Sequence, residues 1–156
     1  MNRYNPEALV RKSQEARNQA YCPYSKFRVG AAVLTSNGTV FTGCNVENAS
    51  YPLGLCAERT AISKAVSEGH TRFKAIAIAR YFSIYKWTNN VSASTDTAIQ
   101  QTVFMSSVLQ FGSQWDVYLS KSDGSYKVMT VEELLPCSFG PDDLRATENT
   151  VGNSKL

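Results

Sequence analysis

The stretch Cys56-Ala57-Glu58-Arg59 decides the interpretation of this chain, because it places a thiol and a carboxylate two positions apart. The sequence from Cys56 to Glu68, closed by Gly69, predicts a helix that begins at this stretch. The free amide hydrogens and the dipole at a helix start favour a thiolate, which is a metal ligand. Glu58 on the first turn would reach a water bound to the same metal. Taken alone, the tripeptide also fits a small buried cysteine followed by a helix-start carboxylate.

A catalytic metal needs further ligands, since catalytic zinc normally has three protein ligands and one open position. The cysteines of the chain are Cys22, Cys44, Cys56 and Cys137, and no two of them form a C-x-x-C pair. We expect Cys22 and Cys44 to be core thiols. Cys56 is therefore the single firm metal ligand that the sequence offers.

Length and composition indicate one globular domain over residues 1–156. The chain is 43% hydrophobic and 19% charged, which is ordinary for a globular protein. Its net charge of +3 is small and its basic residues are dispersed, so we expect no nucleic-acid partner. It has neither the apolar core of a signal peptide nor an apolar run that could span a membrane, so we expect a cytosolic, reducing location.

Local patterns predict an α/β domain with helices on both faces of a sheet. Asn5 and Pro6 predict the start of a first helix. Asn37-Gly38 predicts a hairpin turn. The expected helices are 6–20 and 56–68 with a helical turn at 131–135, and the expected strands are 29–35, 39–46, 73–79, 115–120 and 126–130.

The stretch from Arg80 to Gln110 differs from its surroundings. Between Tyr81 and Gln110 only Lys86 and Asp96 are charged, while Ser, Thr, Asn and Gln are frequent. Residues 97–111 could form a helix, but the first half of the stretch has no steady period. The composition changes at both ends of the stretch, but the stretch does not look like a linker between domains. The tail at 147–156 is polar, and we expect it to fray.

Three long blocks of this sequence resemble the small, tetrameric, zinc-dependent cytidine deaminases of pyrimidine salvage, especially the animal type. The blocks are Tyr21-Cys22-Pro23-Tyr24-Ser25-Lys26-Phe27 with Val29-Gly30-Ala31-Ala32, Gly43 through Ala61, and Trp115 through Leu144 with Leu135-Pro136-Cys137-Ser138-Phe139-Gly140-Pro141. The resemblance covers residues 6–80 and 111–146. It implies a three-layer α/β/α domain with a five-stranded mixed sheet.

The resemblance also implies a reaction and its catalytic residues. That reaction is the hydrolytic deamination of cytidine and deoxycytidine to uridine and deoxyuridine, in which zinc-activated water attacks C4 and ammonia leaves. Cys56 matches the first zinc ligand and Glu58 the general acid/base. Arg59 resembles the arginine that donates hydrogen bonds to the ligand sulfurs.

The same resemblance implies how the nucleoside is bound. Asn45 and Glu47 match the pair that holds the ribose hydroxyls, and two residues spaced this way on a strand point to the same side. Phe27 and Ala57 match positions that contact the substrate. Tyr51 and Phe139 resemble residues that reach a neighbour's pocket in a homotetramer. The implied ligands are cytidine, deoxycytidine and their analogues.

One block departs from the family pattern. Where the family has Pro-Cys-Gly-x-Cys-Arg-Gln, this chain has residues 80–110, and Gln101 and Phe104 stand where the two cysteines should be. Neither residue is a credible zinc ligand. We expect His70 to lie about 20 Å from Cys56, beyond the other end of the same helix. Cys137 and Asp96 are the remaining, weak alternatives.

Three interpretations stay open. The chain could be a working deaminase with an unusual metal shell, a zinc-free family member that binds nucleosides or serves as an assembly subunit, or a splice product of an ordinary enzyme. From the ligand count we predict little or no turnover by this polypeptide.

Overall fold

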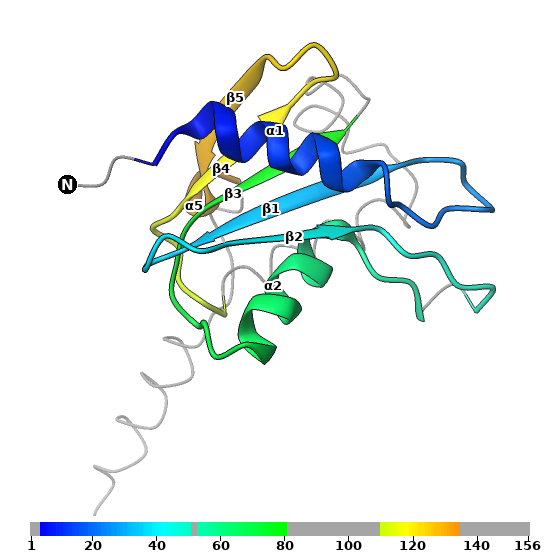
Figure 1. Cartoon of the computed structure of the whole chain (residues 1–156), viewed down its shortest axis with the longest axis horizontal. Coiled ribbons are helices and arrows are strands. Elements are labelled where there is room, and N and C mark those ends of the chain that lie inside the picture. The colour runs from blue at the N-terminus through cyan, green and yellow to red at the C-terminus, as the bar shows by residue number, and fades with distance from the viewer. Residues whose placement is uncertain (1–3, 51–52, 81–109, 135–156) are drawn as a thin grey trace, which may run out of the picture.

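The computed structural model describes residues 4–50, 53–80 and 110–134. Its helices and strands are α1 (Pro6–Arg17), β1 (Val29–Thr35), β2 (Val40–Cys44), α2 (Ala57–Ser67), β3 (Phe73–Arg80), β4 (Asp116–Ser120), β5 (Tyr126–Thr130) and α5 (Val131–Leu134) (Figure 1). Every strand predicted from the sequence is present, within a few residues at each end. The helix predicted at 97–111 lies outside the described ranges except for its last two residues. The polar tail at 147–156 lies wholly outside them.

The five strands form one mixed sheet in the order β2-β1-β3-β4-β5. The pairing of β3 with β4 is parallel, and the other three pairings are antiparallel. Helix α1 covers one face of the sheet and α2 the opposite face, which gives three layers (Figure 1). The predicted α/β architecture with a five-stranded mixed sheet is therefore confirmed.

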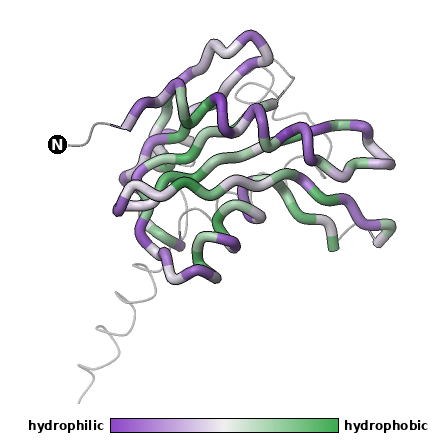
Figure 2. The backbone as a smooth tube through the Cα atoms, in the orientation of Figure 1, coloured by the Kyte–Doolittle hydropathy of each residue, from purple (hydrophilic) through white to green (hydrophobic). Residues whose placement is uncertain are grey.

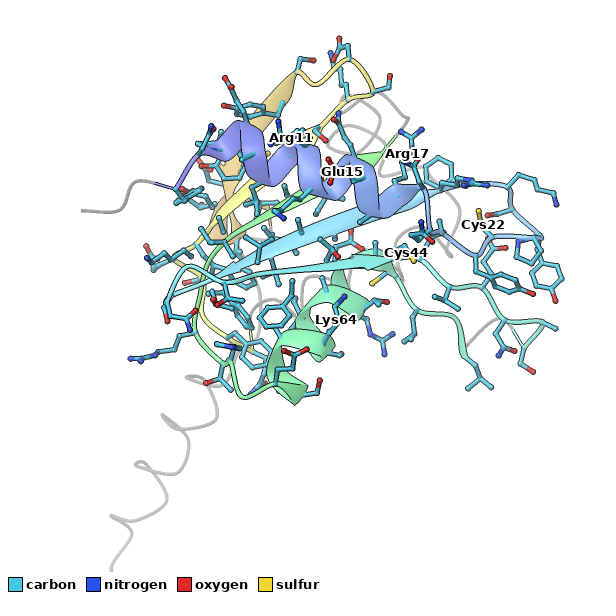
Figure 3. The ribbon with its side chains drawn as sticks, viewed as in Figure 1. Arg11, Glu15, Arg17, Cys22, Cys44 and Lys64 are labelled. Carbon is cyan, nitrogen blue, oxygen red and sulfur yellow. The ribbon has the colours of Figure 1, made fainter. Side chains whose placement is uncertain are left out.

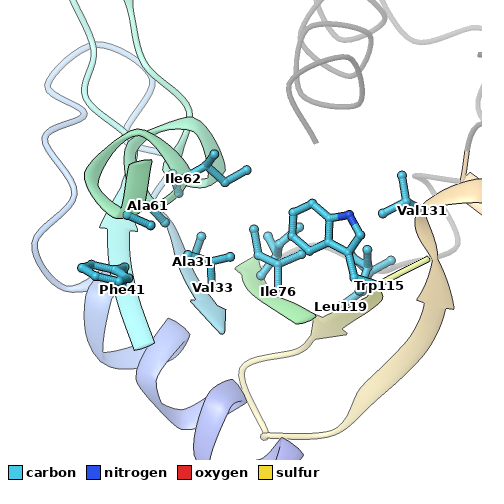
Figure 4. Close-up of a cluster of buried hydrophobic side chains, with 13 residues drawn as sticks. Ala31, Val33, Phe41, Ala61, Ile62, Ile76, Trp115, Leu119 and Val131 are labelled. Atoms are coloured by element: carbon cyan, nitrogen blue, oxygen red, sulfur yellow. The ribbon is translucent and has the colours of Figure 1, made fainter. Parts of the chain in front are cut away.

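The central strands divide their side chains between the two faces by size. On β3, Ile76 and Ile78 point to the α2 side, while Ala75 and Ala77 point to the α1 side. This alternation explains the run of alternating Ala and Ile in the sequence. The hydropathy colouring shows apolar residues along the inner strands (Figure 2). The α2-side core extends to Trp115 under the C-terminal half of the sheet (Figure 4).

Helix α1 ends earlier than its sequence pattern predicts. Its start is as expected, because the side chain of Asn5 accepts a hydrogen bond from the Glu7 amide at 2.9 Å and Pro6 occupies the first turn. The helix ends at Arg17, and Asn18 is its C-cap. Tyr21 then forms a parallel bridge with Val46. The chain must leave the helix before residue 20 to reach that bridge.

Among the residues that the structure describes, none forms a helix that is both long and apolar enough to cross a bilayer.

Candidate functional site

Three segments far apart in the sequence meet at the end of the sheet where β1 begins and β2 ends. Tyr21 donates its amide to the Asn45 carbonyl at 3.0 Å and accepts from the Glu47 amide at 2.8 Å. Val46 and Leu55 exchange two backbone hydrogen bonds of 2.9 Å. These bridges place the loop after α1, the segment after β2 and the start of α2 beside one another. Figure 3 shows Cys22 and Cys44 at this end of the sheet.

Cys56 and Glu58 stand at the start of α2, as predicted. Cys56 is the N-cap in an extended conformation, and Glu58 lies in the first turn. The Cys56 carbonyl accepts hydrogen bonds from the amide of Thr60 at 3.1 Å and from its hydroxyl at 3.0 Å. Glu58 is only 8% exposed. A carboxylate this well buried is positioned by the fold rather than left to sample solvent.

The expected thiolate at Cys56 is not favoured by this environment. The pKa of the Cys56 thiol is raised to about 12, first by burial and then by the neighbouring charge of Glu58. The Arg59 amide and guanidinium lower the pKa, but less strongly. Desolvation and a like charge therefore outweigh the effect of the helix start, so in the absence of a bound cation the thiol is neutral.

Asn45 connects the end of β2 to the start of β1. Its side-chain oxygen accepts from the Val29 amide at 2.8 Å, and its side-chain nitrogen donates to the Phe27 carbonyl at 2.8 Å. Since β2 ends at Cys44, Asn45 continues the strand only as an extended segment. A carboxamide has two donor hydrogens and two acceptor positions, so one of each is still available for a ligand.

Glu47 is bound by the turn at Tyr24 and Ser25. One carboxylate oxygen accepts the amides of Tyr24 at 2.9 Å and Ser25 at 3.1 Å, and the other accepts the Ser25 hydroxyl. The Ser25 hydroxyl is the main cause of the lowered pKa of Glu47, and Lys26 adds a favourable charge. Glu47 is therefore ionised at neutral pH. Sequence reasoning missed this use of Ser25, because no local pattern links residues 22 positions apart.

The remaining predicted residues divide between the described and the undescribed parts of the chain. Ala57 is fully buried at the first position of α2, and Phe27 and Arg59 are half-buried. Tyr51 and Phe139 lie outside the described residues, as do Asp96, Gln101, Phe104 and Cys137. The interface roles of Tyr51 and Phe139 and the weak metal alternatives Asp96 and Cys137 remain predictions.

The donor set of this chain does not fit a catalytic zinc ion. Within residues 4–50, 53–80 and 110–134 no three His, Cys, Asp or Glu side chains are grouped closely enough to bind a metal ion. His70 follows the far end of α2, and its ring packs on Phe41 with the ring centroids 5.2 Å apart. Residues 81–109 contain neither cysteine nor histidine. Among the residues that the structure describes, Cys56 has no partners that would complete the usual three protein ligands.

Replacing Asn45 with alanine is expected to lower the free energy of unfolding by about 2 kcal/mol, because the Val29 amide and the Phe27 carbonyl would lose their partner. Urea unfolding followed by circular dichroism measures this loss. Asn48→Ala is the matched control, since Asn48 is exposed and caps only the Ser50 amide, so a change of about 0.5 kcal/mol or less is expected. An equal loss of unfolding free energy in both variants would contradict the idea that the Asn45 side chain stabilises the fold by joining the end of β2 to the start of β1.

Known proteins resemble this chain over most of its length. Residues 3–104 match the family model described as the cytidine and deoxycytidylate deaminase zinc-binding region. A cytidine deaminase of Sporosarcina psychrophila is 41% identical over 140 residues, which cover 88% of this chain and 93% of that protein. A cytidine deaminase of Halalkalibacterium halodurans is 39% identical over 140 residues, covering 88% of this chain and 96% of that protein.

The same family is found among solved structures. The crystal structure of cytidine deaminase from Burkholderia pseudomallei matches with a TM-score of 0.69 and 36% identity, covering 87% of this chain and 100% of that one. Cytidine deaminase from Mycobacterium tuberculosis matches with a TM-score of 0.63 and 30% identity, covering 88% and 99%. Because the family match spans well over half of the 156 residues, this chain belongs to the cytidine and deoxycytidylate deaminase family.

Proposed function

We propose that the site of this protein is built for cytidine and deoxycytidine and for their hydrolytic deamination to uridine and deoxyuridine in pyrimidine salvage, and that this polypeptide itself shows little or no turnover. One observation carries the proposal. A buried carboxylate, Glu58, stands at the start of α2, and the polar pair Asn45 and Glu47 lies on the segment bridged to the residue before Cys56. A proton carrier beside a sugar-binding pair is what nucleoside deamination requires.

Each residue has a distinct task in this proposal. Glu58 moves a proton between the attacking water and the ring nitrogen, then to the departing amine. Asn45 and Glu47 bind the sugar hydroxyls, and Phe27 and Ala57 contact the base. Arg59 lowers the pKa of the Cys56 thiol. The family model describes a zinc-binding region, and zinc would supply an activated water, but the donors in the described part of the chain do not fit that ion. We therefore assign no step to a metal.

The incomplete donor set favours a second candidate function for this polypeptide. A family member without zinc that keeps the nucleoside cradle would bind cytidine without turning it over, or would serve as an assembly subunit of a homotetramer. Tyr51 and Phe139 would then act at subunit interfaces in the cytosol. The stretch from Arg80 to Gln110 would be a splice-derived replacement of the second zinc motif.

Zinc content and cytidine binding decide between the two candidates. After exhaustive dialysis we expect far less than one zinc per chain by elemental analysis, together with measurable cytidine binding by calorimetry. Glu47→Gln should weaken that binding about 10-fold, because a hydrogen bond to a charged group is lost. Cys56→Ser should leave the zinc content unchanged.

The other outcomes are equally informative. Stoichiometric zinc that disappears in Cys56→Ser, accompanied by turnover, would establish the enzyme and contradict the misfit of the donors. A folded chain with neither zinc nor nucleoside affinity would reject both the deaminase and the nucleoside-binding family member, and would leave only the assembly subunit.

A further inference from the structure

The carboxylate of Glu47 is held by a turn rather than by the sheet. Its three donors are the amides of Tyr24 and Ser25 and the hydroxyl of Ser25. Ser25 therefore supplies two of the three hydrogen bonds. It reaches both carboxylate oxygens, because its amide binds one and its hydroxyl binds the other. A carboxylate bound at both oxygens has a defined rotation about its last bond.

The hydroxyl of Ser25 is itself fixed in orientation. It accepts the Phe27 amide at 3.1 Å, so its single hydrogen is directed to Glu47. Lys26 between them has φ of 58°, in the left-handed region that few residues other than glycine adopt. The Lys26 amide donates to the Cys22 carbonyl at 3.1 Å, which closes the turn. Backbone strain of this kind persists where the surrounding contacts determine the conformation.

The turn leaves the Glu47 carboxylate with few free hydrogen-bond acceptor positions. An ionised carboxylate has about four acceptor positions, and the turn fills three of them. About one position remains for an incoming hydroxyl. Tyr24 and Ser25 are exposed, so these two residues do not fill the core. Their contacts instead restrain the Glu47 carboxylate, which would otherwise sample several rotamers in water. Without that restraint, ligand binding would have to offset the conformational entropy lost when the side chain is ordered.

We propose that Ser25 is a positioning residue for nucleoside binding, which orients Glu47 so that its remaining acceptor position receives a single sugar hydroxyl. This inference rests on the proposed function, since it takes Glu47 to be the residue that binds the sugar. Ser25 itself touches no part of the ligand. Its effect must therefore pass through Glu47 and must depend on the presence of the sugar.

The chain contains a matched control for Ser25. In the turn between β4 and β5, Ser125 donates its amide at 2.9 Å and its hydroxyl at 2.6 Å to the carboxylate of Asp123. The Ser125 contacts lower the pKa of Asp123 as Ser25 lowers that of Glu47. The two serines have the same chemistry, but only Ser25 lies at the bridged segments. Ser125→Ala therefore shows the effect of losing a serine–carboxylate hydrogen bond at a turn away from the proposed nucleoside site.

The test compares cytidine with 1-methylcytosine, which lacks the sugar, by calorimetry on the full chain. Ser25→Ala should weaken cytidine about 5- to 10-fold, the size of one hydrogen bond to a charged group, and change 1-methylcytosine by less than about 2-fold. Ser25→Thr, which keeps a hydroxyl, should restore cytidine binding. In a Glu47→Gln background, Ser25→Ala should have no further effect on cytidine. Ser125→Ala should leave both ligands unchanged.

A carboxyl-detected NMR titration gives a readout that needs no ligand. In Ser25→Ala the pKa of Glu47 should rise toward the ordinary value of a solvent-exposed glutamate, while the pKa of Asp123 stays unchanged. Equal weakening of both ligands, an additive loss in the Glu47→Gln background, or an unchanged Glu47 titration would overturn the inference. If the unmodified chain bound neither ligand, the proposed function would fail and this inference with it. If it bound cytidine and Ser25→Ala had no effect, only the inference would fail.

Discussion

Exchanging residues 81–110 for a block that carries Pro-Cys-Gly-Ala-Cys-Arg-Gln is expected to give about one zinc per chain and cytidine turnover at least about 10⁴-fold faster than that of the present chain. As a rate ratio, a gain of about 10⁴-fold is at most about one hundredth of the roughly 10⁶-fold or greater acceleration that enzymes typically provide. Zinc is measured by elemental analysis, and turnover by the loss of cytidine absorbance. Arg80 is kept, since it ends β3.

The geometry of β3 explains why ligands must come from this part of the chain. Arg80 pairs with Val29 across the antiparallel ladder, and the Val29 amide is bound by Asn45. Strand β3 therefore ends at the end of the sheet where Asn45 lies. This is also the carboxyl end of the parallel pair β3 and β4, the edge at which α/β sheets usually bind ligands. Two thiolates delivered here could join Cys56 as the second and third ligands.

The matched control for this exchange is the same block with serine in place of both cysteines. It should fold as well as the cysteine block and hold no zinc, since it differs only in the sulfur atoms. A folded product that binds zinc but remains inactive would show that a second defect lies in the rest of the chain. A folded product of the cysteine block without zinc would contradict the placement of the ligands at the end of β3.

Replacing Gly43 with alanine is expected to lower the free energy of unfolding by about 2–3 kcal/mol. A Cβ atom at Gly43 would lie 2.5 Å from the Ala57 carbonyl and 2.4 Å from the Ala61 amide. Both are backbone atoms of α2, so the helix that carries Glu58 would have to move away from β2. For a domain of this size, the loss corresponds to a decrease in melting temperature of about 5–10 °C. Thermal unfolding followed by circular dichroism measures it.

Gly38→Ala separates this collision from the general cost of replacing a glycine. Gly38 has φ of 94° and no atom within 4 Å of an added Cβ, so this variant has only the left-handed backbone cost of about 1 kcal/mol. Gly30→Ala tests the opposite face, where a Cβ would lie 2.1 Å from the Ser13 carbonyl of α1. If Gly43→Ala lowered the free energy of unfolding no more than Gly38→Ala does, the close contact of α2 with β2 at Gly43 would be contradicted.

Much of the site could be predicted from the sequence because its key residues sit at recognisable local boundaries. Cys56 and Glu58 begin a helix whose start is marked by Gly54 and whose end is marked by Gly69, and the structure places both as expected. The protonation of Cys56 could not be predicted in this way. Its pKa depends on how deeply the sulfur is buried, and burial is a property of the packed domain.

The sequence by itself determined the elements whose signals are local: the β1 and β2 hairpin at Asn37-Gly38, the capped start of α1, and the alternation of Ala with Ile on β3. The prediction that the zinc donors are incomplete also comes from residue type, since neither Gln101 nor Phe104 is a credible zinc ligand, and it stays a prediction. Only the tertiary structure decided the strand order, the early end of α1 at Arg17, and the turn at Ser25 that holds Glu47. These features depend on contacts between residues distant in sequence, which side-chain periodicity along one segment does not encode.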